Sequence, residues 1–180
     1  MGERQIILWR HGRTSWNAER RFQGQSDIEL DDVGRAQAER AAELLAYLEP
    51  DRIIASDLAR AWATAQALSA RTGVQVTADA RLRETFAGEW EGLSRAELLE
   101  RHGDEVARWA SDSAARPGGG ETRIEVADRV VAAITDGLDE VAESGTLVVA
   151  THGRAARAAP LPTVTAAASV ATGVGAIHLE

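Results

Sequence analysis

Two histidine–glycine pairs, His11-Gly12 and His152-Gly153, each follow an apolar run of the sequence. The runs, residues 6–9 and 146–150, are continuous, which is typical of strands buried on both faces in a parallel sheet. Because ligands of such sheets bind beyond the carboxyl ends of the strands, the two histidines are expected to face one crevice. A single pair of this kind is more often a plain turn, so it is the recurrence that indicates a site.

Two arginines and a carboxylate complete the set of residues that could act at this crevice, namely Arg10, Arg60 and Glu84. Arg10 precedes the first histidine, Arg60 lies one turn into the helix expected after the second strand, and Glu84 follows the third strand. Taken singly, Arg60 is typical of a solvated helix side chain, and Glu84 of a partner for Arg81 or Arg83. Their convergence with the two histidines favours a functional interpretation.

These residue types suit the transfer of a phosphoryl group. Two guanidinium groups can neutralise a phosphate dianion and hold its oxygens bidentately. One neutral histidine can attack phosphorus and carry the phosphoryl group covalently, while the other donates hydrogen bonds to the equatorial oxygens. A carboxylate can protonate the leaving alcohol and later activate water. Because arginine and histidine supply the positive charge, this chemistry requires no metal ion or other cofactor.

The composition excludes several other kinds of protein. A chain of 180 residues with 44% hydrophobic and 27% charged side chains is typical of one globular domain rather than a disordered segment. It has no cysteine, which excludes a disulfide scaffold, a thiolate metal site and a cysteine nucleophile. The net charge of −8 argues against nucleic acid and anionic membranes as partners, and a small molecule is the expected ligand.

All 20 residues of the lysine and arginine class are arginine. Composition bias explains most of them, because the chain is also rich in alanine. Arginine also holds planar or tetrahedral anions bidentately, so some of these residues could serve recognition. Composition does not separate the two explanations, whereas position in the chain does.

No stretch of the sequence has the apolar core of a signal peptide. None approaches the ~20 consecutive apolar residues that a membrane-spanning helix requires. A cytoplasmic protein is therefore expected.

The elements that must position the candidate residues alternate along the chain. Apolar runs predict strands at residues 6–9, 52–55, 74–77 and 146–150. Periodicity and capping signals predict helices over 33–48 behind Asp31, from Ser56-Asp57 to Gly73, from Ser94, over 105–111, and from Thr122 to Gly145. This alternation predicts the α/β class, as a three-layer α/β/α sandwich with a mostly parallel central sheet, in a single domain over residues 1–180.

Two details of these helices carry expectations of their own. The helix after Thr122 is expected to turn six apolar residues inward: Ile124, Ala127, Val131, Ile134, Leu138 and Val141. The tripeptide Arg101-His102-Gly103 repeats the first motif, but it follows a helical stretch and not an apolar strand. It is therefore expected at an exposed helix terminus, outside the site.

Several motifs follow one another in the order of a known family. They are Leu8-Trp9-Arg10-His11-Gly12-Arg13-Thr14-Ser15-Trp16-Asn17, Arg21-Phe22-Gln23-Gly24-Gln25-Ser26-Asp27, Ser56-Asp57-Leu58-Ala59-Arg60-Ala61, Leu82-Arg83-Glu84, Gly88-Glu89-Trp90-Glu91-Gly92, Gly119-Gly120-Glu121-Thr122 and Val148-Val149-Ala150-Thr151-His152-Gly153. Through these motifs, over roughly residues 5–157, the sequence resembles the histidine phosphatase superfamily in its phosphoglycerate mutase-like branch. The resemblance implies the α/β fold of that branch.

The resemblance also implies roles for the matching residues. His11 would be the phosphorylated nucleophile, and Glu84 the proton donor. The phosphate pocket would be formed by Arg10, Arg60, Asn17, His152 and Gly153. The substrate side would be lined by Gln23 and Gly24. No metal ligand and no cofactor is implied.

The short connection from Glu84 to Gly118 is typical of the phosphatases in this branch, since mutases exclude water with a larger insertion and tail. Gln23-Gly24-Gln25 and Leu82-Arg83-Glu84-Thr85 are similar to the segments of glucosyl-3-phosphoglycerate phosphatases. We expect a metal-independent phosphomonoesterase that forms a phosphohistidine and acts on a small metabolite, a phosphosugar or phosphoglycerate derivative. Two alternatives stay open, a cofactor-dependent phosphoglycerate mutase and a module that binds phosphate esters without turnover.

Residues 158–180 depart from the family pattern. They contain Pro160 and Pro162, which stop a helix, and then a stretch rich in alanine, threonine and valine. One strand is expected around residues 170–179. The support beneath His152 and a dimer surface would depend on this segment, so a homodimer is left open.

Overall fold

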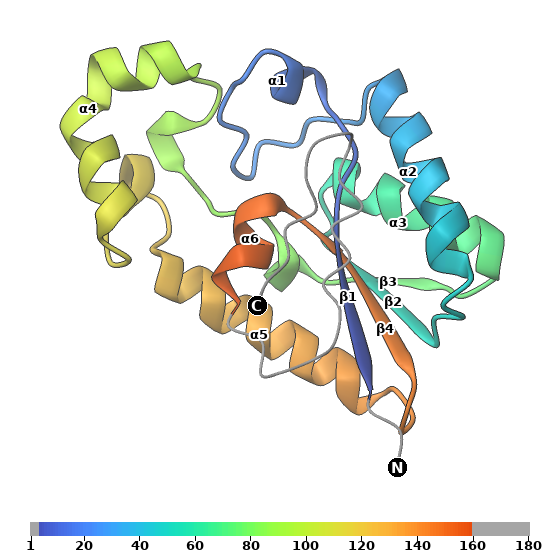
Figure 1. Ribbon diagram of the computed structural model, residues 1–180. Coiled ribbons are helices and arrows are strands. Elements are labelled where there is room, and N and C mark those ends of the chain that lie inside the picture. Colours follow the sequence, from blue (N-terminus) through green and yellow to red (C-terminus); the bar gives the residue numbers. More distant parts are fainter. Residues whose placement is uncertain (1–3, 160–180) are drawn as a thin grey trace.

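The computed structural model describes residues 4–159, and its centre is a sheet of four parallel strands (Figure 1). The strands are β1 (Gln5–Arg10), β2 (Arg52–Ala55), β3 (Val76–Ala78) and β4 (Thr146–Thr151), in the spatial order β1-β4-β2-β3. All four predicted strands are confirmed, with small shifts at their ends. The continuous apolar runs suit this sheet because its central strands are covered on both faces.

The register of β1 against β4 places the two histidine–glycine pairs side by side. Arg10 at the end of β1 lies opposite Thr151 at the end of β4. The backbone N–H of His11 donates to the carbonyl oxygen of Thr151 at 3.0 Å, which extends the pairing by one residue. Both pairs therefore leave the sheet at the same edge, as the sequence predicts.

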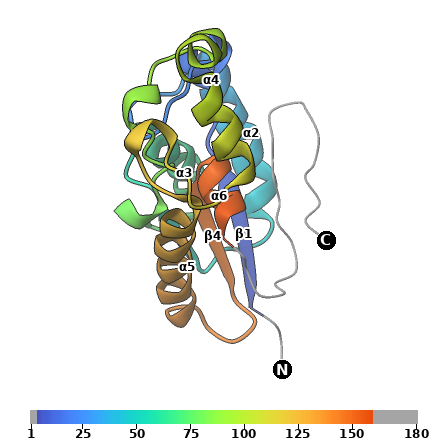
Figure 2. The same ribbon diagram turned by 90° about the vertical axis from the view of Figure 1, so that its left-hand side faces the viewer.

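Helices cover both faces of the sheet, which confirms the three-layer α/β/α sandwich. α2 (Asp32–Ala46) and α3 (Ala59–Thr72) pack on one face. α5 (Arg123–Asp139) and α6 (Gly153–Ala158) pack on the other. Figure 2 shows β1 and β4 between α5 on one side and α2 on the other.

The side chains of β1 and β4 alternate between two apolar cores. Ile7 and Val148 point into the core beneath α2 and α3. Ile6 and Leu147 point into the core beneath α5 and α6. The sheet is therefore buried on both faces, and it holds the two histidine loops at a rigid edge.

Side-chain caps set the starts of two long helices. The carboxylate of Asp31 accepts the N–H of Gly34 at 2.8 Å at the beginning of α2. Thr122 and Glu125 form a reciprocal capping box at the beginning of α5. Both caps agree with the sequence prediction.

α3 begins later than the sequence predicts. Its N-cap is Leu58, which has no capping side chain, and not Ser56-Asp57. The Ser56 hydroxyl instead lies 2.9 Å from Nε2 of His152, so it serves the site and not the helix. The helix ends as predicted at Gly73, whose φ of 75° is left-handed and suits glycine.

α4 (Arg95–Ser111) is one kinked helix where the sequence predicts two short ones. The kink lies at His102, whose φ of −133° and ψ of 27° are not helical. The repeated tripeptide is therefore inside a helix, and the prediction of a helix terminus is wrong. Its predicted place away from the strand ends is confirmed. Trp109 of this helix packs against Phe22 and Trp90 in a separate aromatic cluster.

Short elements connect these larger ones. α1 (Ser15–Ala18) follows the first histidine loop. Three turns of 3-10 helix are Ala80–Leu82, Gly88–Trp90 and Pro117–Gly119.

The buried face of α5 differs from the predicted one. Ile124 is 52% exposed, and Ala127, Val131 and Leu138 are only partly buried, whereas Ile134 is buried as predicted. The helix ends at Asp139 and not at Gly145 as predicted, so Val141 is buried but lies beyond its end. The buried residues of the helix are Val126, Val130, Ala133, Ile134 and Gly137. A Cβ at Gly137 would lie 3.0 Å from Ile54, so the helix lies close against the sheet there, which fits its observed rotation. Apolar periodicity alone cannot show it, because apolar residues extend around much of this helix.

The strand expected around residues 170–179 and most of the atypical segment 158–180 lie outside the described residues. Among the helices that the structure describes, none is both long enough and apolar enough to span a membrane.

Candidate active site

His11 is buried at the carboxyl end of β1, with 6% of its surface exposed. Its Nδ1 lies 2.7 Å from the carbonyl oxygen of Gly12, which can only accept, so Nδ1 carries the ring proton. Burial, together with the positive charges of Arg60 and Arg10, lowers the pKa of His11 to about 3. The ring is therefore neutral at pH 7, and Nε2 keeps the free lone pair of a nucleophile.

His152 lies beside His11, with ring centroids 5.1 Å apart. It is fully buried, and burial together with His11 and Arg60 holds the pKa of His152 well below its ordinary value. The Ser56 hydroxyl accepts the N–H of Leu58 at 3.3 Å, so its own proton can be donated to Nε2 of His152. In the tautomer in which Ser56 donates to Nε2, Nδ1 carries the ring proton, and this buried nitrogen has no partner among the described residues.

Arg60 is a fully buried arginine in the first turn of α3. Nη1 donates to the carbonyl of Ser26 at 2.8 Å, and Nη2 donates to that of Gly24 at 2.7 Å. Its Nε has no partner within residues 4–159. Because an unsatisfied buried N–H is costly, Nε is a donor that a bound anion would satisfy.

Arg10 ends β1, and its exposed side chain passes over Gly153. A Cβ on that glycine would lie 3.3 Å from Nε of Arg10 and 3.4 Å from Cζ. Glycine at position 153 therefore lets the guanidinium group approach the strand end. The charge of Arg10 contributes to the lowered pKa values of both His11 and His152, so it acts on the whole crevice.

Glu84 is buried, with 6% of its surface exposed, against the first turn of α6. Its Oε1 accepts the N–H groups of Thr85 at 2.9 Å and Ala155 at 3.0 Å, and its Oε2 accepts the N–H of Arg154 at 3.2 Å. Because α6 directly follows His152, these bonds tie the carboxylate to the second histidine loop.

The arginines nearest to Glu84 in the sequence pair with other acids. Arg83 binds the carboxylate of Asp57 through two bonds of 2.7 and 2.6 Å. Arg81 binds Asp79 at 2.7 Å. The interpretation of Glu84 as a simple ion-pair partner for these arginines is therefore wrong.

Thr14 orients both predicted amide side chains. Its N–H donates to Oδ1 of Asn17 at 3.0 Å, and its hydroxyl donates to Oε1 of Gln23 at 2.9 Å. With their oxygens occupied in this way, the two side chains keep their NH2 groups as donors for a ligand.

The loop at Gly24 is held by Glu91, a residue to which sequence analysis gives no role. Oε1 of Glu91 accepts the N–H of Gln25 at 2.9 Å, and Oε2 accepts the hydroxyl of Ser26 at 2.6 Å. Gly24 has a φ of 52°, and a Cβ there would lie 2.1 Å from Oε1 of Glu91, so no side chain fits. The only signal was the position of Glu91 in the Gly88–Gly92 motif, which does not reveal its partners.

Arg129 of α5 is a second residue that sequence analysis missed. Its Nη1 donates to the carbonyls of Arg81 and Arg83 at 2.7 and 2.6 Å, and its Nη2 donates to that of Glu84 at 2.9 Å. Its Nε also binds the carboxylate of Glu121 at 2.9 Å. No pattern in the sequence distinguishes it from other helix arginines, because its role depends on where α5 crosses this loop.

Two guanidinium groups, two imidazoles and two amides therefore gather at the edge of the sheet. In the part of the chain that the structure describes, no group of three or more His, Asp or Glu side chains is arranged to hold a metal ion. The donor set suits a tetrahedral oxyanion such as phosphate.

A family model described as histidine phosphatase superfamily (branch 1) matches residues 6–161. The match spans all the residues placed at the site above. The chain belongs to the histidine phosphatase superfamily. The resemblance carried by the motifs is thereby confirmed.

Two curated proteins place the chain within this superfamily. A glucosyl-3-phosphoglycerate phosphatase of Mycolicibacterium vanbaalenii is 46% identical over 129 residues, which cover 72% of this chain and 57% of that protein. The chain thus matches little more than half the length of this relative. The phosphoglycerate mutase-like protein 4 of Arabidopsis thaliana is 38% identical over 153 residues, covering 83% of this chain and 66% of that protein.

Two solved structures share the fold of this chain. The mycobacterial glucosyl-3-phosphoglycerate phosphatase in complex with VO3 has a TM-score of 0.80 and 39% identity, covering 85% of this chain and 78% of that one. Bacillus stearothermophilus YhfR also has a TM-score of 0.80, with 31% identity, covering 86% of this chain and 77% of that one.

Proposed function

We propose that this histidine phosphatase is a phosphomonoesterase that acts through a phosphohistidine on a small phosphorylated metabolite. The observation that carries the proposal is the neutral, buried His11, with Nδ1 fixed on the carbonyl of Gly12. Beside it lie two buried nitrogens, Nδ1 of His152 and Nε of Arg60, that lack partners among the described residues. A nucleophile next to such donors suits a phosphoryl group, whose charge the donors stabilise.

The reaction follows from these positions in two steps. Nε2 of His11 attacks phosphorus, so that a P–N bond forms while the ester P–O bond breaks. Arg10, Arg60 and His152 stabilise the charge on the phosphoryl oxygens, and Glu84 gives a proton to the leaving alcohol. Glu84 then takes a proton from water as the water oxygen attacks phosphorus. The P–N bond breaks, inorganic phosphate forms, and His11 is restored.

The remaining residues of the predicted site act in binding. The amide groups of Asn17 and Gln23 donate to the substrate. Gly24 orients Arg60 through its carbonyl, and Gly153 leaves room for Arg10. The positive charge comes from side chains, so we expect turnover without a metal ion.

The proposed substrate class is a phosphosugar or phosphoglycerate derivative. Glucosyl-3-phosphoglycerate is the first compound to test, because relatives named for its hydrolysis are 46% and 45% identical to the chain. A module without turnover is less favoured because it would need neither the nucleophile nor the acid, and a mutase is less favoured because the connection after Glu84 is short. A homodimer and a cytoplasmic location stay predictions from the sequence.

Rapid-quench labelling with a phosphate ester tests the proposal. We expect an acid-labile phosphoenzyme in the wild type and none in His11→Asn, with turnover that EDTA leaves unchanged. His102→Asn, the same replacement at the kink of α4, is the matched control and should be labelled normally. Metal-dependent turnover, or labelling of His11→Asn, would contradict the mechanism. Transfer of the label to phosphoglycerate faster than to water would identify a mutase instead.

A further inference from the structure

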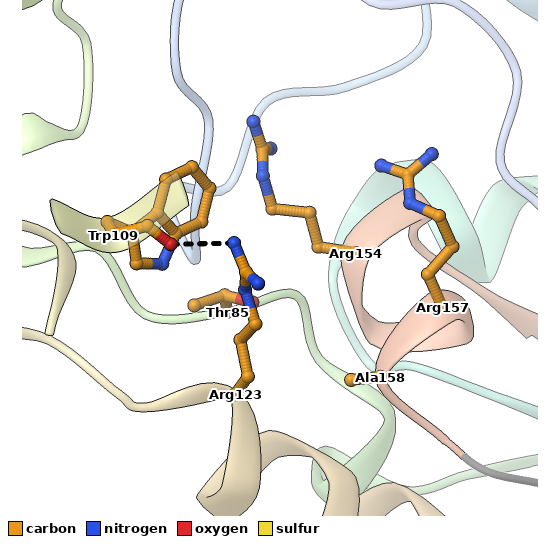
Figure 3. Close-up of a pocket in the computed structure, with 6 residues that line it drawn as sticks. All are labelled: Thr85, Trp109, Arg123, Arg154, Arg157 and Ala158. Carbon is orange, nitrogen blue, oxygen red and sulfur yellow. Dashed lines mark hydrogen bonds between the residues drawn. The ribbon is translucent and has the colours of Figure 1, made fainter. Parts of the chain in front are cut away.

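A cavity of about 290 Å³ lies next to the proposed active site (Figure 3). It is lined by Thr85, Trp109, Arg123, Arg154, Arg157 and Ala158. Thr85 directly follows Glu84, and the backbone N–H of Arg154 binds the carboxylate of Glu84. The cavity and the proposed catalytic acid therefore share a wall.

The cavity concentrates positive charge. Arg154 and Arg157 come from α6, Arg123 begins α5, and no acidic side chain of the described residues lines the space. Figure 3 shows the side chains of Arg123 and Arg154 beside Trp109, with Arg157 on the other side of Arg154. Within residues 4–159, none of the three guanidinium groups forms an ion pair with a carboxylate.

Arg154 is held in place by aromatic rings and not by an acid. Its Cζ lies 4.2 Å from the ring centroid of Phe22 and 5.3 Å from that of Trp109. Burial lowers the pKa of the Arg154 guanidinium; Glu84 acts in the opposite direction, and the neighbouring charge of Arg157 adds to the lowering. The arginines thus repel one another in a partly desolvated space, and a bound anion would relieve that repulsion.

The three arginines make few side-chain hydrogen bonds that would stabilise the fold. Arg123 is the only one of the three whose side chain donates a hydrogen bond to a described residue, at 2.7 Å to the carbonyl of Trp109. The exposed side chain of Arg157 has no such bond within the described chain. By contrast, Arg83 donates two hydrogen bonds to the carboxylate of Asp57, through Nε and Nη2.

We propose that this cavity binds a second anionic group of the substrate, a carboxylate or a second phosphate, while the ester phosphate lies at His11. The proposal rests on the proposed function and narrows it. It makes the enzyme selective for phosphate esters that carry another anion a few atoms away from phosphorus. Arg123, Arg154 and Arg157 are then specificity-determining residues.

Three small phosphate esters test the proposal and distinguish a carboxylate subsite from a phosphate subsite. The first is 3-phosphoglycerate, the second is glycerol 3-phosphate, in which a hydroxymethyl group replaces the carboxylate, and the third is propanediol bisphosphate. In the wild type we expect kcat/KM for at least one of the doubly anionic esters to exceed that for glycerol 3-phosphate by about tenfold or more, mainly through KM. A preference for 3-phosphoglycerate identifies a carboxylate subsite, and a preference for the bisphosphate identifies a phosphate subsite.

Arg157→Gln and Arg123→Gln test the named residues, and both side chains are exposed, so neither change should prevent folding. Each should reduce the preference by roughly tenfold, the value of one charge-assisted hydrogen bond. Arg35→Gln removes an exposed arginine of α2 on the far face of the sheet and should leave all three rates unchanged. Equal wild-type rates for all the esters, or a preference that survives both substitutions, would overturn the subsite.

The outcomes separate this inference from the proposed function. If the wild type hydrolyses none of the esters, nor p-nitrophenyl phosphate, the proposed function itself fails. If it hydrolyses all of them without preference, the phosphatase stands and only the anion subsite is refuted.

Discussion

His11 is held neutral inside the fold, and this single residue links stability to pH. Its pKa is about 3 in the folded protein against an ordinary value of 6.5. Between these pH values an unfolded chain binds a proton that the folded chain does not bind, so acid favours unfolding. The stability that His11 provides is complete above about pH 6.5 and is lost as the pH falls towards about 3. The pKa of His152 is lowered too, so its contribution has the same sign.

We therefore predict that His11→Asn makes the protein less sensitive to acid. Between about pH 7.5 and about pH 5, the wild type should lose about 2 kcal/mol more of its unfolding free energy than the variant, because only the wild type must protonate this ring on unfolding. Urea unfolding at several pH values measures the difference. The same pH dependence in both proteins would show that His11 is not held neutral in the native state.

The proposed role of Glu84 as proton donor can be tested by replacing its carboxylate with an amide. If it protonates the leaving alcohol, Glu84→Gln should lower kcat for an alkyl phosphate by about 10²–10⁴-fold. The loss should be much smaller for p-nitrophenyl phosphate, because nitrophenolate leaves without a proton. Comparing kcat for the two esters measures the effect. Glu89→Gln, an exposed carboxylate nearby, is the control and should change neither rate. Equal losses for both esters would argue that Glu84 serves only binding or folding.

At the scale of elements, Arg129 joins α5 to the loop that carries Glu84. It donates to the carbonyls of Arg81, Arg83 and Glu84 and binds Glu121. Arg129→Lys keeps the charge but cannot reach so many acceptors at once. We predict an unfolding free energy lower by about 2 kcal/mol, since hydrogen bonds to charged groups are each worth about 1.5–3 kcal/mol.

The same variant separates positioning from plain stability. If Arg129 holds Glu84 in place, kcat for an alkyl phosphate should fall by roughly tenfold, with a smaller loss for p-nitrophenyl phosphate, as in Glu84→Gln. A variant that is less stable but keeps the wild-type ratio of the two rates would limit Arg129 to a structural role. Both rates are measured well below the melting temperature of the variant.

The elements that could be predicted are those defined by local signals. The strands read as unbroken apolar runs, and Asp31 and Thr122 cap their helices through bonds made within one turn. The predictions that were wrong concern features that are set by contacts with distant parts of the chain. The rotation of α5 fits the close approach of Gly137 to the sheet, and Ser56 serves His152 across the fold and not the start of α3.

At the scale of the whole molecule, the site could be predicted because parallel strands end at one edge. That rule brings His11 and His152 together from opposite ends of the sequence, and β1 does lie next to β4. It says nothing about Glu91 or Arg129, whose partners lie in loops far from them in the sequence. The three-arginine cavity was missed for the same reason, since Arg123 and Arg157 meet only when α5 and α6 pack.

The molecule carries a net charge of −8, yet arginines cluster around the crevice and the cavity beside it. A small anion can enter this positive region, whereas a long acidic chain must also approach the negative surface around it. Salt screens such repulsion, with a Debye length of about 10 Å at 0.1 M. We predict that raising the ionic strength to about 0.3 M increases kcat/KM for a phosphorylated acidic peptide several-fold relative to a small ester. A phosphopeptide of the same length with glutamine at the acidic positions should show a smaller increase in relative kcat/KM. If the relative kcat/KM of the acidic peptide stays constant or falls with salt, the overall charge has no part in excluding large substrates.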